Sequence, residues 1–375
     1  MESVYDIVLF GASGFTGRLT AEYLVRHAGP DVRWALAGRD RAKLEALGLD
    51  VPVIVADASD PAALAAQARV IATTVGPYVS YGEPLVKACA EAGTHYLDLT
   101  GEPEFVDRMF LRYDAVAAAS GAKIVHACGF DSIPWDLGVL HTVLRLPEGV
   151  PITVRGFLRG HLRASGGTLA SALTAFSRLP HMIEAGAQRR TADPGPPGRR
   201  ISSLPGLLRY VGGWAIPMPT IDHQIVGRSA RLLDRYGPDF TYRQYYGAGS
   251  LPAALSAGVG AVSLVALAQI PPARAWLARR LPAGSGPTPS QRAAHWFRAT
   301  FLGEGGGRRV VTHVAGGDPG YDETAKMLAE SALCLAFDDT PKIAGSVTTA
   351  SAMGEPLIRR LHAAGITFST AGAPS

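Results

Sequence analysis

The sequence has few lysines and few cysteines, and each shortage excludes a class of protein. Only five of its 36 basic residues are lysines, so arginine supplies most of the net charge of +4. The arginines are scattered apart from a group within 189–200, which does not indicate a nucleic-acid-binding surface. Cys89, Cys128 and Cys334 lie far apart and fit neither a disulfide framework nor a Cys-x-x-Cys motif. We therefore expect a cytoplasmic protein that binds no nucleic acid.

Two further absences concern targeting and metal binding. The beginning of the chain does not combine a basic start with a long apolar run, so no secretory signal is expected. Histidine, cysteine and carboxylate residues form no cluster with metal-ligand spacing, so no metal site is expected. Hydrophobic residues still make up 47% of the chain and charged residues 18%, which predicts an ordered chain with a large core.

The length and the order of apolar segments predict an α/β fold with two lobes. Residues 1–147 alternate short apolar runs such as DIVLF, WALAG and RVIATTVG with helical patterns, which is typical of a doubly wound parallel sheet. We expect a Rossmann domain over 1–147 and an α+β domain for substrate binding and closure over 148–375. In the second lobe, strands are expected at 220–226, 240–246 and 308–317.

The segment GASGFTG has the clearest functional pattern. It lies between an apolar strand and a helix, which is the context of a dinucleotide-binding fingerprint. Gly11 would permit the tight turn, Gly14 would leave space for a pyrophosphate, and Gly17 would let helix and strand pack closely. Further residues expected to contact the cofactor here are Ser13, Phe15 and Thr16. The structural alternative is a glycine-rich turn that binds no ligand.

The residues after the second predicted strand favour NADP(H) over NAD(H). An NAD site usually has a carboxylate there for the ribose 2′-hydroxyl, whereas an NADP site has an arginine for the 2′-phosphate. Arg39 comes first and Asp40 follows it, so we predict that Arg39 binds the 2′-phosphate. Alternatively, Arg39 is a solvated loop residue and Asp40 caps the next helix. Asp57, after the third strand, could meet the adenine or start a turn.

The loops after the fourth and sixth strands supply candidate residues for the reaction. Tyr78 would stand close to the reacting ring of the cofactor, or it is a packing aromatic. Asp131 could hydrogen-bond a carboxamide or a substrate carbonyl, or it belongs to a helix cap. We name Tyr78 and Asp131 as catalytic candidates. The residues expected to line the nicotinamide ribose are Thr74, Val75, Gly76 and Pro77.

Several other polar residues allow a functional and a structural interpretation. Asp98 and Glu102 could form a paired-carboxylate site, although carboxylates at strand ends often cap turns. His126 lies in an apolar strand, where a histidine is usually a core residue. Residues 165–168 could approach the substrate or begin a helix.

One long segment, 251–272, contains no charged residue and is followed by Arg274, Arg279 and Arg280. Its length is sufficient to cross a membrane, which requires about 20 apolar residues. Alanine, glycine and serine dominate it, and prolines lie near both ends. The composition favours a buried or interface helix over peripheral membrane contact, and peripheral contact over a true span.

Five segments together resemble a known family. They are GASGFTGR, TTVGPYVSYGEPLVKACAEAGTHYLDLTGE, HACGFDSIPWDLG, GGDPGYDETAKMLAESALCLA and the AGR after the second strand. They resemble the saccharopine dehydrogenase-like oxidoreductases and, within them, the trans-acting enoyl reductases. The resemblance implies an NADPH-binding Rossmann lobe and a second lobe that closes over the substrate.

The resemblance also implies the reaction and its partners. Enoyl reductases of this group reduce unsaturated acyl chains made by polyketide synthases that lack their own reductase. We therefore expect a small-molecule or carrier-bound acyl substrate and a polyketide synthase or acyl carrier as partner. A homodimer and peripheral membrane contact through 251–272 are compatible with these expectations. The alternatives are an imine or carbonyl reductase and a non-catalytic NADP-binding sensor or scaffold.

Overall fold

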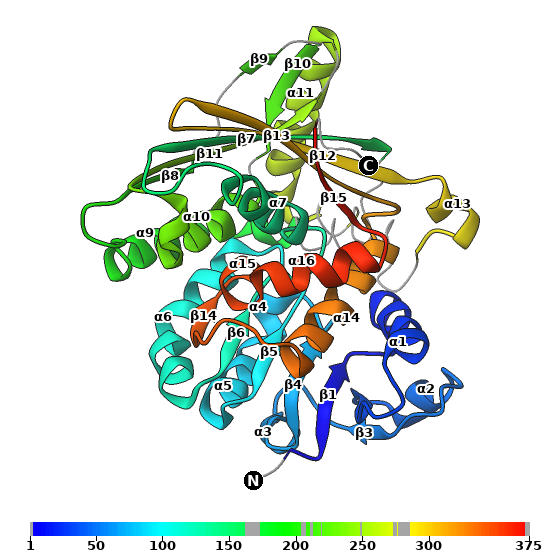
Figure 1. Ribbon diagram of the computed structural model, residues 1–375. Helices are drawn as coiled ribbons and strands as arrows, with labels where there is room; N and C mark the ends of the chain where they lie inside the picture. Colours follow the sequence, from blue (N-terminus) through cyan, green and yellow to red (C-terminus); the bar gives the residue numbers. More distant parts are fainter. Residues whose placement is uncertain are drawn as a thin grey trace.

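The fold comprises two sheets and the helices packed around them (Figure 1). The computed structural model describes residues 3–161, 173–203, 208–210, 213–218, 220–247, 250–272, 276 and 286–371. The first sheet occupies one end of the molecule and the second sheet the other. This arrangement agrees with the α/β fold class expected from the sequence.

The first sheet is parallel and has the strand order β14-β6-β5-β4-β1-β2-β3. Its strands are β1 (Tyr5–Phe10), β2 (Trp34–Gly38), β3 (Val53–Val55), β4 (Ala68–Thr73), β5 (His95–Leu97), β6 (Lys123–Val125) and β14 (Gly345–Val347). The chain order reverses between β1 and β4, and ligands of such sheets bind beyond the carboxyl ends of the strands at this point. The fold thus places the loops after β1 and β4 where a dinucleotide would bind.

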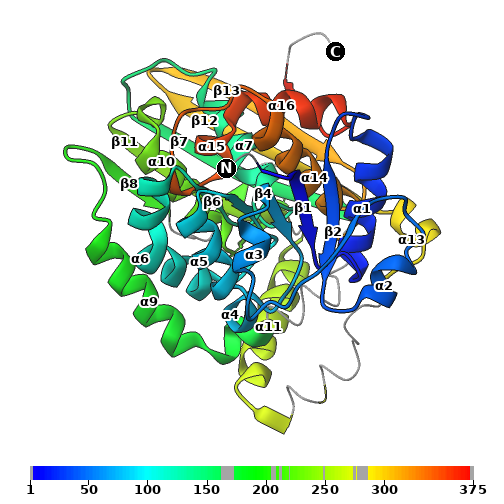
Figure 2. The same ribbon diagram turned by 90° about the horizontal axis from the view of Figure 1, so that it is seen from below.

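Helices cover both faces of the first sheet. They are α1 (Phe15–His27), α2 (Arg41–Glu45), α3 (Ala62–Ala65), α4 (Tyr78–Tyr81), α5 (Glu83–Ala92), α6 (Pro103–Ser120) and α14 (Asp322–Phe337). Figure 2 shows α14 and α5 on opposite sides of the sheet. Alternate residues of β1 face them: Leu9 belongs to the same apolar cluster as Leu328 of α14, and Phe10 to the cluster of Leu85 of α5. Coverage on both faces explains why these strands are continuously apolar.

The second sheet is mixed and has β7 near its centre. Its strands are β7 (Ile152–His161), β8 (Arg200–Ser203), β9 (Leu208–Tyr210), β10 (Gly213–Pro217), β11 (Asp239–Gly247), β12 (Trp296–Gly305), β13 (Arg308–Gly316) and β15 (Thr367–Thr370). The main path runs β15-β13-β12-β7-β11-β10-β9, and β8 pairs with β11. The strands expected at 240–246 and 308–317 are confirmed as β11 and β13.

The remaining helices lie between or beside the sheets. They are α7 (Ile133–Val143), α9 (Leu179–Ala192), α10 (Asp222–Leu232), α11 (Leu251–Ala268), α13 (Pro289–Ala293), α15 (Thr349–Ala352) and α16 (Gly354–Ala363), with a 3-10 turn at Asp234–Tyr236. Every residue of α7 is buried. Its Trp135 packs edge-on against Phe301 of β12 with ring centroids 5.9 Å apart, so α7 joins the lobes into one continuous core.

Three features differ from the sequence-based expectations. The strand expected at 220–226 is wrong, because these residues lead into α10; Ile221 and Ile225, four residues apart, pack together on one helix face. Residues 345–347 form β14 of the first sheet although they follow the expected domain boundary at 147, and that boundary stays a prediction.

Helix α11 is long and apolar enough to cross a membrane by length and composition, and only 8% of it is buried. The expectation that it is buried within the chain is therefore wrong.

Candidate functional site

The fingerprint segment forms a tight turn between the ends of β1 and β4. Gly11 has a φ of +90°, and a Cβ there would lie 2.7 Å from Val75 Cγ2. A Cβ at Gly17 would lie 2.3 Å from the Gly11 carbonyl oxygen. The Thr74 hydroxyl donates to the same carbonyl at 3.0 Å, which ties the turn to the loop after β4. Gly11 and Gly17 are thus required by the fold itself.

Gly14 has a different role, because no protein atom crowds it. A Cβ there would meet only the Gly11 carbonyl oxygen, at an ordinary 3.4 Å. Gly14 is the N-cap of α1, no side chain caps this helix, and its first turn has no acidic residue. Backbone N–H groups at such an end, together with the helix dipole, bind phosphates well. The exposed turn at Ser13 and Gly14 therefore fits the pyrophosphate of a dinucleotide.

The backbone carbonyl of Thr16 accepts a hydrogen bond from the Thr20 hydroxyl within α1. Phe15 contacts residues that are far away in the chain. The Phe15 ring contacts the ring of Tyr321 edge-on, with centroids 4.8 Å apart. Gly286 lies against the same ring, since a Cβ at Gly286 would approach it to 2.3 Å. Residues from beyond β11 and β13 therefore cover one side of the fingerprint turn.

The loop after β2 presents an arginine to solvent. Asp40 accepts a hydrogen bond from the Lys43 N–H at 3.2 Å and so caps α2. Asp57 accepts two hydrogen bonds from Ser59 and starts a turn. Those bonds and the nearby charge of Arg39 lower the pKa of Asp57. Because Asp40 is engaged as a cap, Arg39 is the available group for a 2′-phosphate; the cofactor roles of Arg39 and Asp57 stay predictions.

The loop after β4 lies beside the fingerprint turn. The Val75 N–H donates to the Thr73 hydroxyl at 3.2 Å, and the Gly76-Pro77 peptide bond is cis. Together with Thr74 this loop lies at the point where the sheet order reverses, which is where ligands of such sheets bind. The expected contact of Thr74–Pro77 with a nicotinamide ribose fits this position and stays a prediction.

Tyr78 is engaged by the protein backbone. Its side chain is 5% exposed, and its hydroxyl donates to the Thr73 carbonyl at 3.2 Å and accepts from the Leu99 N–H at 3.1 Å. Glu102 accepts the N–H groups of Tyr78 and Val79 at 3.0 and 2.8 Å and so holds the start of α4. These contacts tie the loops after β4 and β5 together. They indicate a structural role for Tyr78, and its catalytic role stays an unsupported prediction.

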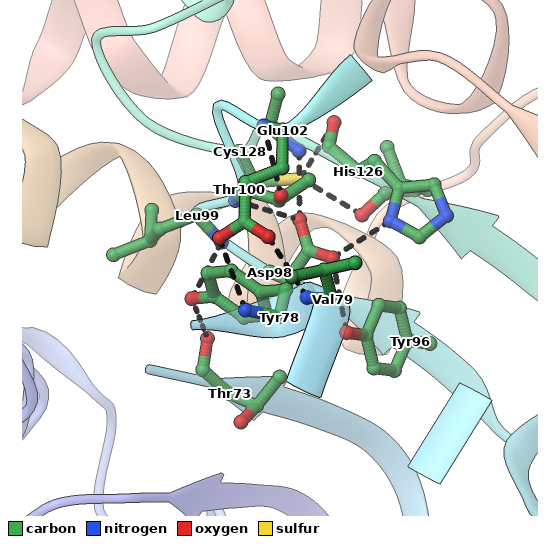
Figure 3. Close-up of polar contacts among 12 residues, drawn as sticks. Thr73, Tyr78, Val79, Tyr96, Asp98, Leu99, Thr100, Glu102, His126 and Cys128 are labelled. Carbon is green, nitrogen blue, oxygen red and sulfur yellow. Dashed lines mark hydrogen bonds and ion pairs between the residues drawn. The ribbon is translucent and has the colours of Figure 1, made fainter. Parts of the chain in front are cut away.

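A buried carboxylate organises the adjacent loops (Figure 3). Asp98 Oδ2 accepts a hydrogen bond from the Tyr96 hydroxyl at 2.9 Å and contacts His126 Nδ1 at 2.7 Å. Its other oxygen accepts the N–H groups of Thr100 and Ala127 at 3.0 and 2.9 Å. Ala127 has a φ of +59°, which is unusual for a residue with a side chain. Asp98 therefore holds the ends of β5 and β6 together, and Asp131 lies in the loop that follows β6.

Asp98 and Glu102 thus do not act as a carboxylate pair, since each holds its own set of backbone groups. His126 is buried as expected, and its Nε2 has no hydrogen-bond partner among the described residues.

Two other carboxyl groups, Asp131 and Asp222, are near enough for one to influence the other electrostatically. Asp131 follows β6 and is partly exposed; a Cβ at Gly101 would lie 3.4 Å from its Oδ2. Burial raises the pKa of Asp131 to about 6. Asp222, at the start of α10, is 1% exposed, and burial and the negative charge of Asp131 raise its pKa well above the usual value. Burial and the nearby Asp131 carboxylate both favour the protonated form of Asp222.

The second lobe holds Asp222 in place. Its Oδ2 accepts hydrogen bonds from the Thr220 hydroxyl and from Gln244 Nε2, the latter at 2.9 Å, and its Oδ1 has no partner in the described part of the chain. Sequence reasoning missed Asp222 and Gln244, since neither lies in a motif and they come from α10 and β11. Residues 165–168 lie outside the described residues. Among the side chains that the structure places, no cluster of three or more histidine, cysteine, aspartate or glutamate residues could hold a metal ion.

Comparisons with known proteins agree with this geometry. Residues 7–125 match the family described as the saccharopine dehydrogenase NADP-binding domain. A Mycobacterium tuberculosis protein described as a candidate trans-acting enoyl reductase is 40% identical, over 98% of this chain and 97% of its own. A trans-acting enoyl reductase of Mycobacterium bovis is 35% identical, over 98% of both chains.

A solved structure supports the fold independently. Apo saccharopine dehydrogenase (L-Glu forming) from Saccharomyces cerevisiae superposes with a TM-score of 0.56 at 13% identity, covering 98% of this chain and 100% of its own. The family match and the turn at Gly14 make the chain an NADP-dependent oxidoreductase. It belongs to the saccharopine dehydrogenase-like oxidoreductases, in the group that contains the trans-acting enoyl reductases.

Proposed function

We propose that this oxidoreductase reduces a carbon-carbon double bond in an acyl or polyketide intermediate. The observation that carries the proposal is the similarity to proteins named trans-acting enoyl reductases, which extends over 98% of the chain. A trans-acting enzyme serves a substrate held by another protein. We therefore infer a carrier-bound thioester as substrate and a polyketide synthase or acyl carrier as partner. Three free, buried cysteines support a reducing cytoplasmic location.

The cofactor has a defined set of candidate contacts. The turn at Gly14 would hold the pyrophosphate, Arg39 the 2′-phosphate, and Thr74–Pro77 the nicotinamide ribose. When bound, NADPH supplies the hydride. The protein's own tasks are to orient the thioester, to exclude water and to provide a proton.

Asp131 has the position and the chemistry for the proton donor. Hydride addition at the β carbon leaves an enolate, whose α carbon then takes a proton from a nearby acid. Asp131 lies at the carboxyl edge of the first sheet, and its pKa of about 6 leaves part of it protonated near neutral pH. Its surroundings bury the carboxyl enough to raise the pKa, but the residue as a whole is partly exposed, so the carboxylate would regain a proton from solvent.

The reaction is tested by following NADPH absorbance with purified protein and a series of 2-enoyl thioesters. Oxidation of NADPH that depends on the thioester, with one saturated thioester formed for each NADPH, is the expected result. Oxidation only with imines or carbonyl compounds would contradict enoyl reduction. NADPH binding without turnover on any acceptor would indicate a sensor.

Replacement of the proton donor gives a sharper test. In Asp131→Asn we expect kcat to fall by roughly 100-fold, the lower range for a general acid, with the NADPH dissociation constant unchanged. In the wild type, kcat should decrease as pH rises above about 6, because the protonated form of Asp131 is required. Asp60→Asn, at an exposed carboxylate, is the control. An Asp131→Asn enzyme with wild-type kcat and pH profile would remove Asp131 from the mechanism.

A further inference from the structure

The helix α11 lies outside the packed body of the protein. Figure 1 shows it beside β10, which lies next to the edge strand β9 of the second sheet. Two of its large side chains are open to solvent: Leu255 is 61% exposed and Val259 is 66% exposed. Leaving such side chains in water is unfavourable, so their exposure indicates an environment that the isolated chain does not provide.

The exposed surface of α11 is not the single stripe of an amphipathic helix. Exposed residues occur at 251–253, 255–256, 259–260 and 266–267, which together cover more than one side of the helix. No charged side chain occurs anywhere in 251–272. A helix that is apolar on several sides is typical of a protein core or of lipid, whereas protein interfaces have a polar rim.

The topology of the second sheet excludes a single crossing of a membrane. β11 ends at Gly247 and β12 begins at Trp296, and both strands pair with β7. The chain therefore leaves this sheet and returns to it on the same side of any bilayer. With about 27 Å of length at 1.5 Å per residue, α11 can enter the acyl region, but the following residues must come back.

The charge around α11 has one sign. From Phe240 to Gly303 the chain contains no aspartate, glutamate or lysine. The same stretch contains six arginines, at 243, 274, 279, 280, 292 and 298. Arg292 is paired with Asp322 at 2.8 Å, so the argument from charge depends on the other arginines of the stretch. Basic residues beside an apolar segment favour a surface of anionic lipids.

From these observations we infer that α11 docks the protein on an anionic lipid bilayer by entering one leaflet without crossing it. The exposed apolar side chains of α11 would lie among the acyl chains, and the positive charge of the flanking sequence would favour anionic headgroups. This inference does not depend on the proposed enoyl reduction, since it concerns a different surface and is tested by binding alone.

The test is sedimentation of the purified full-length protein with vesicles. The wild type should sediment with vesicles of mixed phosphatidylcholine and phosphatidylglycerol. It should bind vesicles of phosphatidylcholine alone much more weakly. Added salt should weaken the binding because it screens the arginines. In Leu255→Asp and Val259→Asp we expect the affinity for the anionic vesicles to fall by at least about tenfold, since a carboxylate is costly among acyl chains.

Matched controls separate docking from folding. Ile183 of α9 is 60% exposed, nearly the same as Leu255, so Ile183→Asp should bind vesicles like the wild type. All variants should keep the wild-type melting temperature and NADPH affinity. Unchanged vesicle binding in both α11 variants, equal binding to neutral and anionic vesicles, or no binding at all would overturn the inference. A wild-type dimer that α11 substitutions dissociate, without vesicle binding, would assign the helix to a second copy instead.

Discussion

Arg39 is the residue on which the choice between the two nicotinamide cofactors is predicted to depend. It is exposed, lies near Asp57, and has Asp40 beside it engaged as a helix cap. In Arg39→Ala we expect the dissociation constant for NADPH to rise roughly 10- to 100-fold, as for loss of a charge-assisted hydrogen bond, with little change for NADH. Fluorescence titration with both cofactors measures this. Equal losses for NADPH and NADH would refute the 2′-phosphate assignment.

The structure distinguishes Tyr78 from Asp131, although the sequence places both residues after the ends of strands. Tyr78 and Asp131 both follow strand ends, but the hydroxyl of Tyr78 is used by Thr73 and Leu99, whereas Asp131 stays partly exposed beside Gly101. Hydrogen bonding to backbone groups depends on how neighbouring loops pack. For that reason no spacing rule could have distinguished the two residues.

The start of helix α1 allows a paired prediction about its two glycines, Gly14 and Gly17. Gly14→Ala should leave the free energy of unfolding nearly unchanged, because only one atom lies within contact distance of its Cβ. It should weaken NADPH binding, because the new methyl group occupies the approach of the pyrophosphate. Gly17→Ala should lower the free energy of unfolding by about 1 to 3 kcal/mol, as overpacking does.

Chemical denaturation and NADPH titration of the two variants provide the measurement. The expected pattern is a loss of binding without loss of stability at Gly14, and a loss of stability at Gly17. If Gly14→Ala bound NADPH like the wild type, the pyrophosphate would have to lie elsewhere.

The packing of whole elements also explains why two expectations are wrong, namely the strand at 220–226 and the burial of 251–272 within the chain. The segment 220–226 is too short to separate a strand from a helix by its pattern alone, and only its packing against Ala127 and Val106 shows the helical face. For α11 the absence of charge was evident, but whether a helix is buried depends on which partners the fold brings to it.

At the scale of the whole molecule, stability should depend on the buried His141 of α7. Burial and then the nearby charge of Arg145 lower its pKa from 6.5 to about 4. As pH falls below 6.5, His141 binds a proton in the unfolded chain but stays neutral in the folded protein. The stability that the neutral His141 contributes is therefore lost between pH 6.5 and 4.

The variant His141→Gln removes this titration. Between pH 7 and 4, its free energy of unfolding should fall by about 2 kcal/mol less than that of the wild type. Denaturation series at several pH values measure the difference, with His27→Gln at an exposed histidine as the control. Parallel pH dependences in the wild type and His141→Gln would show that His141 titrates normally in the fold.

The sequence by itself determined what depends on neighbours along the chain. The apolar strand, the three glycines and the following helix identify the cofactor-binding turn, because each requirement acts within a few residues. The parallel first sheet follows from the alternation of strands and helices, and the missing charges of 251–272 define the apolar helix.

Only the tertiary structure decided what depends on distant packing. It brought β14 to the first sheet, Tyr321 to Phe15, and Asp222 to Asp131, although these partners are far apart in the chain. It also left α11 outside the core. Such contacts arise from the simultaneous burial of many apolar surfaces, and local patterns of sequence do not encode which surfaces meet.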